Sequence, residues 1–107
     1  MFNLVKIGDK EVEMVANAAT PFRFKQIFHE DFLQLTSTQN NDGAAAGIII
    51  QLAYVMAMQA AGKDMKKLNE ESFMAWLEGF EPNAMVEALG DVMDVYSGTA
   101  KTAASPK

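Results

Sequence analysis

Apolar and polar residues alternate loosely over the first fifteen positions of the chain. Two β-prone runs, FNLVKI at residues 2–7 and EVEMV at residues 11–15, flank a Gly-Asp pair. This pattern predicts a β-hairpin at about residues 2–15. Because a lone hairpin is only marginally stable, we expect it to pack on the rest of the chain, in a register that the sequence does not fix. The apolar side chains available for that contact are Leu4, Val5, Ile7, Val12 and Met14.

The next segment changes to a helical spacing of apolar residues. Thr20 is suited to capping and Pro21 to the first helical position, so a helix is predicted over residues 21–35. Phe22 lies roughly 160° around this helix from Phe24, which leaves two roles open for it: packing on the hairpin or contacting a partner. The main apolar stripe predicts core contacts by Phe24, Ile27, Phe28, Phe32 and Leu35.

A long apolar stretch, GAAAGIIIQLAYVMAMQAA, follows the polar loop TSTQNNDG and covers residues 43–61. A helix that is apolar on all sides is expected to be central and covered by its neighbours. Gly62 suits the position just after its C-terminus. The stretch is long enough to consider as a membrane span. Its alanine content, with Gln51 and Gln59, favours a buried core helix instead.

Two further helices are predicted beyond a solvated KDMKK linker. Asn69 caps the first, with two glutamates in the first turn, where the helix dipole favours acids. Pro82 ends that helix, Asn83 caps the second, and Gly98 ends the second. Their inward faces consist of Phe73, Trp76, Leu77 and Phe80, and of Met85, Val86, Leu89, Val92, Met93 and Tyr96.

Together these elements predict a mainly α, small α+β fold of about four helices with an N-terminal β-hairpin. The chain has 107 residues, of which 50% are hydrophobic, and this fits one folded domain. We assign that domain to residues 1–98 and expect Trp76 to be mostly buried. Residues 99–107 have the composition of a flexible tail.

Charge and cysteine content narrow the classes of function. The formal net charge is −5, and residues 68–98 carry seven acids with no lysine or arginine. An acidic surface repels phosphate backbones, so nucleic-acid binding is disfavoured. The chain has no cysteine, which excludes disulfides, thiolate metal sites and a cysteine nucleophile. No signal peptide is expected from the N-terminal sequence.

The single histidine, His29, is followed by Glu30 and Asp31 and is the strongest candidate for chemistry. Neighbouring residues on a helix point about 100° apart, so these three do not converge on one atom. A zinc site needs further His or Cys ligands, and phosphate-binding glycine motifs are absent. We expect a partly exposed histidine at the edge of an apolar face, and no enzyme, metal site or cofactor.

Methionine is abundant, at eight residues, and suits both irregular cores and adaptable binding surfaces. The central helix is therefore either buried all round or buried in part only within an assembly. A partner helix lying in an apolar groove is the expected mode of contact. The residues that we expect to touch a partner are Phe22, Arg23, Phe28, Phe32, Met56, Met58, Trp76 and Phe80.

The stretch ATPFRFKQIFHEDFLQL, Ala19–Leu35, resembles the first helix of small tail assembly chaperones from long, flexible-tailed phages and prophages of Gram-positive bacteria. In that family an Ala-Thr-Pro stretch leads into (R)(F/Y)KxxFxxD(L/F)L, and LAxxM and WLxxF motifs follow. The resemblance covers roughly residues 1–100. The matching residues are Arg23, Phe24, Lys25, Phe28, Asp31, Phe32 and Leu33, then Leu52, Ala53 and Met56, then Trp76, Leu77 and Phe80.

The resemblance implies a protein of the host bacterial cytoplasm that binds the tape measure protein, the long helical protein that sets tail length. Such a chaperone keeps its client soluble until the tail tube protein polymerises around it, and it is absent from the mature virion. The family pattern supplies no catalytic or cofactor residues. It leaves open contact with the tail tube protein, self-association and a longer frameshifted form. Two alternatives are a structural virion component, such as a tail connector or completion protein, and a small helical regulatory or interaction module.

Overall fold

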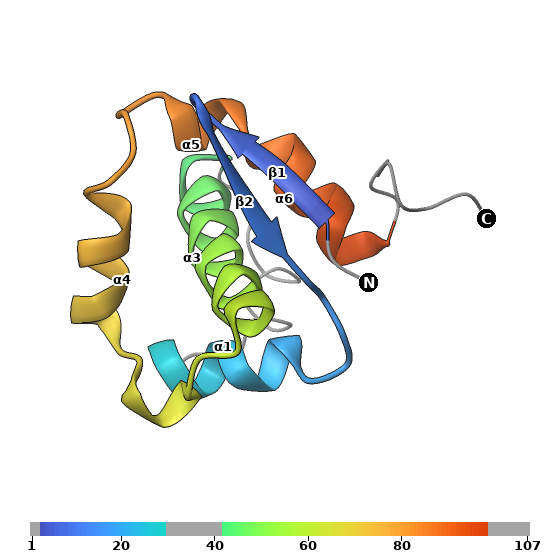
Figure 1. The fold of residues 1–107 in the computed structure, drawn as a ribbon, viewed down its shortest axis with the longest axis vertical. Coiled ribbons are helices and arrows are strands. Elements are labelled where there is room, and N and C mark those ends of the chain that lie inside the picture. The colour runs from blue at the N-terminus through green and yellow to red at the C-terminus, as the bar shows by residue number, and fades with distance from the viewer. Residues whose placement is uncertain (1–2, 30–41, 99–107) are drawn as a thin grey trace.

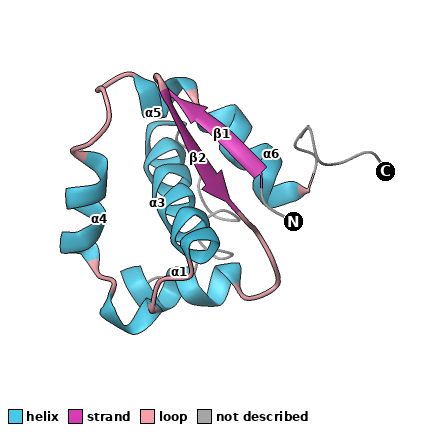
Figure 2. Ribbon diagram, in the orientation of Figure 1, coloured by secondary structure: helices cyan, strands magenta, loops and turns pink. Residues whose placement is uncertain are grey.

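The computed structural model describes residues 3–29 and 42–98 of the chain. Figure 1 shows one long helix at the centre, with a β-hairpin across it and shorter helices around it. This arrangement confirms the predicted small α+β fold. In chain order the elements are β1 (Asn3–Ile7), β2 (Lys10–Met14), α1 (Thr20–Phe28), α3 (Asp42–Ala61), the short 3-10 helix η1 (Met65–Lys67), α4 (Glu70–Leu77), α5 (Ala84–Glu87) and α6 (Leu89–Ser97) (Figure 2).

The hairpin turns at Gly8 and Asp9 and pairs β1 antiparallel to β2, with Val5 opposite Val12. Gly8 has a φ of 68°, the left-handed value that the first residue of a type II′ turn needs. A Cβ atom at Gly8 would lie 3.3 Å from the Cβ atom of Ala84, so the turn packs closely on α5. The predicted hairpin is confirmed, and its register is now defined.

One face of the hairpin packs on the helices and the other faces solvent. Val5, Ile7 and Met14 are buried, and Val12 is half-buried. The expected packing of Leu4 is wrong, because its side chain is 59% exposed. Successive side chains of a strand point to opposite faces, which places Leu4 on the outer face with Lys6, Glu11 and Glu13.

Helix α1 is shorter than the helix predicted over residues 21–35. His29 has a φ of 62° and its N–H donates to the carbonyl of Lys25 over 2.7 Å, which ends the helix with a left-handed residue. The expected capping by Thr20 is also wrong, because Thr20 is itself helical and fully buried. Its Oγ1 instead accepts a hydrogen bond from the N–H of Asn17 at 2.9 Å.

The apolar stripe of α1 faces the core as its spacing predicts. Phe24, Ile27 and Phe28 are all buried. Phe22 is 74% exposed, so it does not pack on the hairpin, and contact with a partner stays open for it. The other two residues of the stripe, Phe32 and Leu35, lie outside the described residues.

Helix α3 runs through the centre of the fold, as its apolar sequence predicts. Every residue from Leu52 to Ala57 is buried, because β2, α1, α4 and α6 all contact this helix (Figure 1). Gly62, with a φ of 72°, follows its last turn as expected. Within residues 3–29 and 42–98, no helix is both long and apolar enough to cross a membrane.

Aromatic rings join α1, α3 and α4. The ring centroid of Phe28 lies 5.1 Å from those of Phe24 and Phe73, and the ring of Tyr54 lies 5.4 Å from Phe73 and from Trp76. Tilted and edge-on contacts of this kind are favourable beyond the area they bury. Trp76 is half-buried rather than mostly buried, which places it at the border of the core.

The connection from α3 to α4 contributes to the core and ends in the predicted cap. Met65 of η1 is buried, so the KDMKK linker is not wholly solvated as expected. Asn69 caps α4 as predicted: its Oδ1 accepts from the N–H of Ser72, and Ser72 Oγ accepts from the N–H of Asn69, both over 2.9 Å. This reciprocal pair forms a capping box.

The single last helix predicted from the sequence is divided into α5 and α6 at Ala88. Ala88 has a ψ of −1°, whereas a continuous α-helix needs about −42°. The break leaves Val86 57% exposed, so its expected inward position is wrong. Asn83 precedes α5 as predicted but makes no side-chain capping bond, and Gly98, with a φ of 82°, ends α6 as predicted.

Candidate binding groove

A groove of about 520 Å³ lies between β2 and α4, next to α3. In the view of Figure 1, β2 runs along one side of α3, and α4 lies on the other side of that helix. The small side chains of Ala57 and Ala61 leave space along α3, and Met58 and Trp76 provide the larger apolar surfaces. The residues that line the groove are Leu4, Glu11, Val12, Glu13, Ala57, Met58, Ala61 and Trp76.

Contacts made by Trp76 of α4 and by Lys10, the first residue of β2, fix the positions of the two sides of the groove. The Trp76 ring packs on Tyr54, 5.4 Å away, and on Phe80, 4.9 Å away. Lys10 Nζ donates a hydrogen bond to the carbonyl of Gly79 and lies 5.2 Å from the centre of the Phe80 ring. The start of β2 is therefore tied directly to the residues that follow α4.

The groove combines an apolar interior with acidic side chains. Glu11 and Glu13 are exposed, and none of the described residues that line the groove is basic. The seven acids of residues 68–98 are also all exposed. An apolar, partly basic segment of another chain is the ligand that such a surface attracts.

Three of the eight residues expected to touch a partner lie at or beside this groove. Met58 and Trp76 line it, and Phe80 is half-buried against Trp76. The sequence prediction missed the contribution of the hairpin, which adds Leu4, Glu11, Val12 and Glu13. The alternation in EVEMV puts both glutamates on one face of a strand, but it does not say that this strand lies beside α4.

None of the other expected contact residues that the structure describes lines the groove. Phe28 and Met56 are buried in the core, so the expectation that they touch a partner does not fit this structure. Arg23 is half-buried, and its Nη1 donates to Gln59 Oε1 over 3.5 Å. Phe22 is exposed on α1, away from the groove lining. Phe32 lies outside the described residues.

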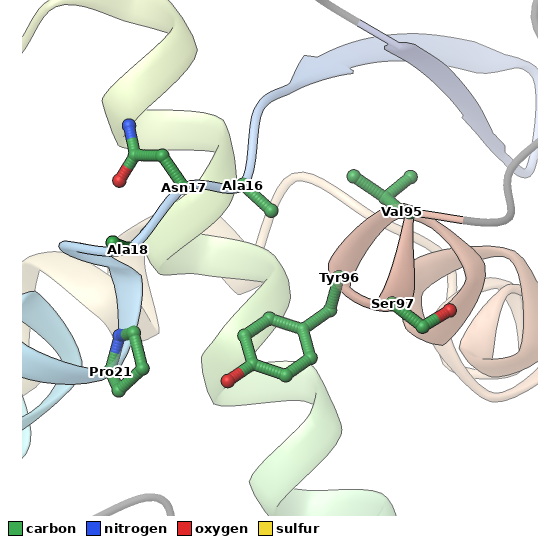
Figure 3. Close-up of a pocket in the computed structure, with 8 residues that line it drawn as sticks. Ala16, Asn17, Ala18, Pro21, Val95, Tyr96 and Ser97 are labelled. Atoms are coloured by element: carbon green, nitrogen blue, oxygen red, sulfur yellow. The ribbon is translucent and has the colours of Figure 1, made fainter.

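A second, smaller cavity of about 320 Å³ lies between the segment before α1 and the end of α6. Figure 3 shows Tyr96 extending from α6 toward the segment that carries Ala18 and Pro21. Burial raises the pKa of Tyr96 above its ordinary value. Asn17 and Ser97 add the polar side chains. Its lining includes the aromatic ring of Tyr96 but neither a methionine nor a tryptophan.

Of the three residues singled out for chemistry, the structure describes only His29, which is exposed, while Glu30 and Asp31 lie outside the described residues. Across residues 3–29 and 42–98, no three His, Asp or Glu side chains come together as metal ligands. Comparison with protein-family models, curated proteins and solved structures gives no significant match. Inference about function therefore rests on the residues and on the groove.

Proposed function

We propose that this protein is a tail assembly chaperone that binds the tape measure protein and keeps it soluble until the tail tube protein polymerises around it. The observation that carries the proposal is the groove, which places Met58 and Trp76 beside Glu11 and Glu13. The resemblance of Ala19–Leu35 and of the later LAxxM and WLxxF motifs to such chaperones supports the same function.

The groove has the physical properties that this task requires. A tape measure protein exposes apolar surface before assembly, and covering that surface removes it from water. Trp76 provides an aromatic anchor of the kind that dominates binding energy, and Met58 adapts its shape to different client segments.

Charge supports the proposal independently of shape. The net charge of −5 and the seven exposed acids of residues 68–98 attract basic client segments and oppose self-aggregation. Because such steering is screened by salt, the association rate with the client should fall as ionic strength rises. An association rate that stays constant from low to high salt would show that electrostatic steering does not contribute to client binding.

The proposed place of action is the cytoplasm of the host bacterium, and the proposed task includes no enzymatic step, cofactor or metal. A chaperone of this kind is absent from the finished particle. Mass spectrometry of purified virions should therefore not detect the chain. Stoichiometric presence in virions would instead favour a structural component such as a tail connector.

The direct test is co-expression with the tape measure protein encoded nearby. The client should move from the insoluble to the soluble fraction and should co-purify with the tagged chaperone. A client expressed without the chaperone is the control. If the client stays insoluble and unbound beside the short chain and beside any longer frameshifted form, the proposal is wrong.

A further inference from the structure

We infer that the groove binds a client segment as an added β-strand, hydrogen-bonded to the free edge of β2, and that this segment alternates apolar and basic residues. The identity of the client rests on the proposed function. The chemistry of the segment follows from the groove itself, so it can be tested without that client.

The register of the hairpin determines which backbone groups of β2 are free. Ile7 and Lys10 flank the two-residue turn and form a hydrogen-bonded pair, and bonded and non-bonded pairs then alternate, so Val12 also bonds to β1. Glu11 and Glu13 belong to the non-bonded pairs and direct their N–H and C=O groups to the opposite edge. The hydrogen bonds among the described residues include none to these four groups.

The free edge is confined to the groove, because other elements occupy it beyond each end. At the C-terminal end, the N–H of Val15 donates to the carbonyl of Met56 over 3.2 Å. Gln59 Nε2 donates to the carbonyl of Val15 over 2.7 Å. At the other end, the Lys10 side chain reaches across to Gly79. The unpaired groups are therefore those of Glu11 and Glu13, both of which line the groove.

An added strand gives hydrogen-bond partners to the backbone groups on the free edge of β2, whereas a helix that covers this edge does not. A helix uses its backbone hydrogen bonds internally, so a helix lying in the groove would bury the edge groups of Glu11 and Glu13 without partners, at a cost in free energy. An added strand supplies an N–H or C=O to each of them. This differs from the helix-in-groove contact expected from the sequence.

The same geometry determines the pattern of the bound segment. Side chains of a strand alternate between two faces. On the inner face of an added strand they meet Met58, Ala61 and Trp76, which favours apolar residues. On the outer face they lie beside Glu11 and Glu13, which favours lysine or arginine because opposite charges on neighbouring strands attract.

The test uses a synthetic peptide with acetylated and amidated ends, KVKVKVK, and a control of the same composition, KKVVVKK. Fluorescence of Trp76, the single tryptophan of the chain, follows binding. Amide exchange by NMR reports on the edge. At saturation KVKVKVK should slow exchange of the Glu11 and Glu13 amides at least about tenfold, and KKVVVKK should bind about tenfold more weakly. Equal binding of the two peptides, or no binding, would overturn the inference.

Backbone N-methylation tests the hydrogen bonds themselves. In an antiparallel addition, the residues that bond to Glu11 and Glu13 lie directly opposite them and carry the outward side chains, which are the lysines of KVKVKVK. Methylating the two central lysine N–H groups should abolish binding, and methylating the valine N–H groups should preserve it. The reverse pattern would indicate parallel addition to the same edge. Equal effects of the two modifications would show that the edge is not used.

These outcomes are distinguishable from those of the chaperone test. If the tape measure protein is solubilised but KVKVKVK does not protect Glu11 and Glu13, the proposed function stands and strand addition is wrong. If the peptide binds as described and the tape measure protein does not, strand addition stands and the proposed function is wrong.

Discussion

Replacing Tyr54 by phenylalanine isolates one partly buried hydrogen bond between α3 and α4. Tyr54 is 1% exposed, and its hydroxyl lies 2.8 Å from Ser72 Oγ. Ser72 Oγ also donates to the carbonyl of Asn69 over 2.8 Å and accepts from the N–H of Asn69 over 2.9 Å. A serine hydroxyl carries one proton, and in this network that proton points to the Asn69 carbonyl, so we assign the Tyr54 hydroxyl as the donor to Ser72.

The assignment of this proton predicts unequal costs for the two ends of the bond. Tyr54→Phe removes the donor and leaves Ser72 Oγ with its Asn69 partners, so it should lower the free energy of unfolding by about 1 kcal/mol. Ser72→Ala leaves a buried tyrosine hydroxyl unpaired and removes half of the capping box. It should cost about 2–3 kcal/mol. The double variant should cost about 1 kcal/mol less than the sum of the two.

Urea unfolding followed by circular dichroism measures all four proteins of this cycle. The melting temperature provides a second readout, with a shift of about 4–8 °C for each kcal/mol in a domain of roughly this size. If Tyr54→Phe costs as much as Ser72→Ala, or if the two effects add within about 0.3 kcal/mol, the hydrogen-bond assignment is wrong.

Other substitutions test the rest of the core by the same unfolding assay. Gln59→Leu leaves the Val15 carbonyl without the side-chain donor described above and should cost about 1–3 kcal/mol, whereas the exposed control Gln26→Leu should change stability by less than about 0.5 kcal/mol. Trp76→Ala should cost about 2 kcal/mol, below the roughly 3–5 kcal/mol of a fully buried aromatic, because Trp76 is half-buried. Phe22→Ser should change stability by less than about 0.5 kcal/mol, since Phe22 is 74% exposed. A larger loss at Phe22, or a smaller loss at Gln59 than at Gln26, would contradict the described packing.

Features determined by a few neighbouring residues could be predicted from the sequence. Gly8 supplies the backbone conformation of the hairpin turn, Asn69 forms the cap of α4 with Ser72, and Gly62 and Gly98 follow the helices that they end. The central position of α3 also follows from its composition, because a helix without a polar face has to be covered.

Features determined by tertiary contacts could not be predicted in this way. His29 adopts a left-handed conformation without being glycine, and the break falls at Ala88, a good helix former, two residues before Gly90. The exposure of Leu4 depends on the register of the hairpin. The groove brings together Leu4, Met58 and Trp76 from three separate elements, so the pattern within any one element does not show it.

The proposal that the tape measure protein binds in the groove is tested most directly by placing a negative charge inside the groove and, in a second variant, the same charge outside it. Met58 lines the groove, and Met74 is a 53% exposed residue of α4 that does not. Each is changed to glutamate, and the soluble fraction of the co-expressed tape measure protein is measured for variants shown by circular dichroism to be folded. We predict that Met58→Glu loses client solubilisation while Met74→Glu retains it. Full solubilisation by a folded Met58→Glu protein would contradict binding at this groove.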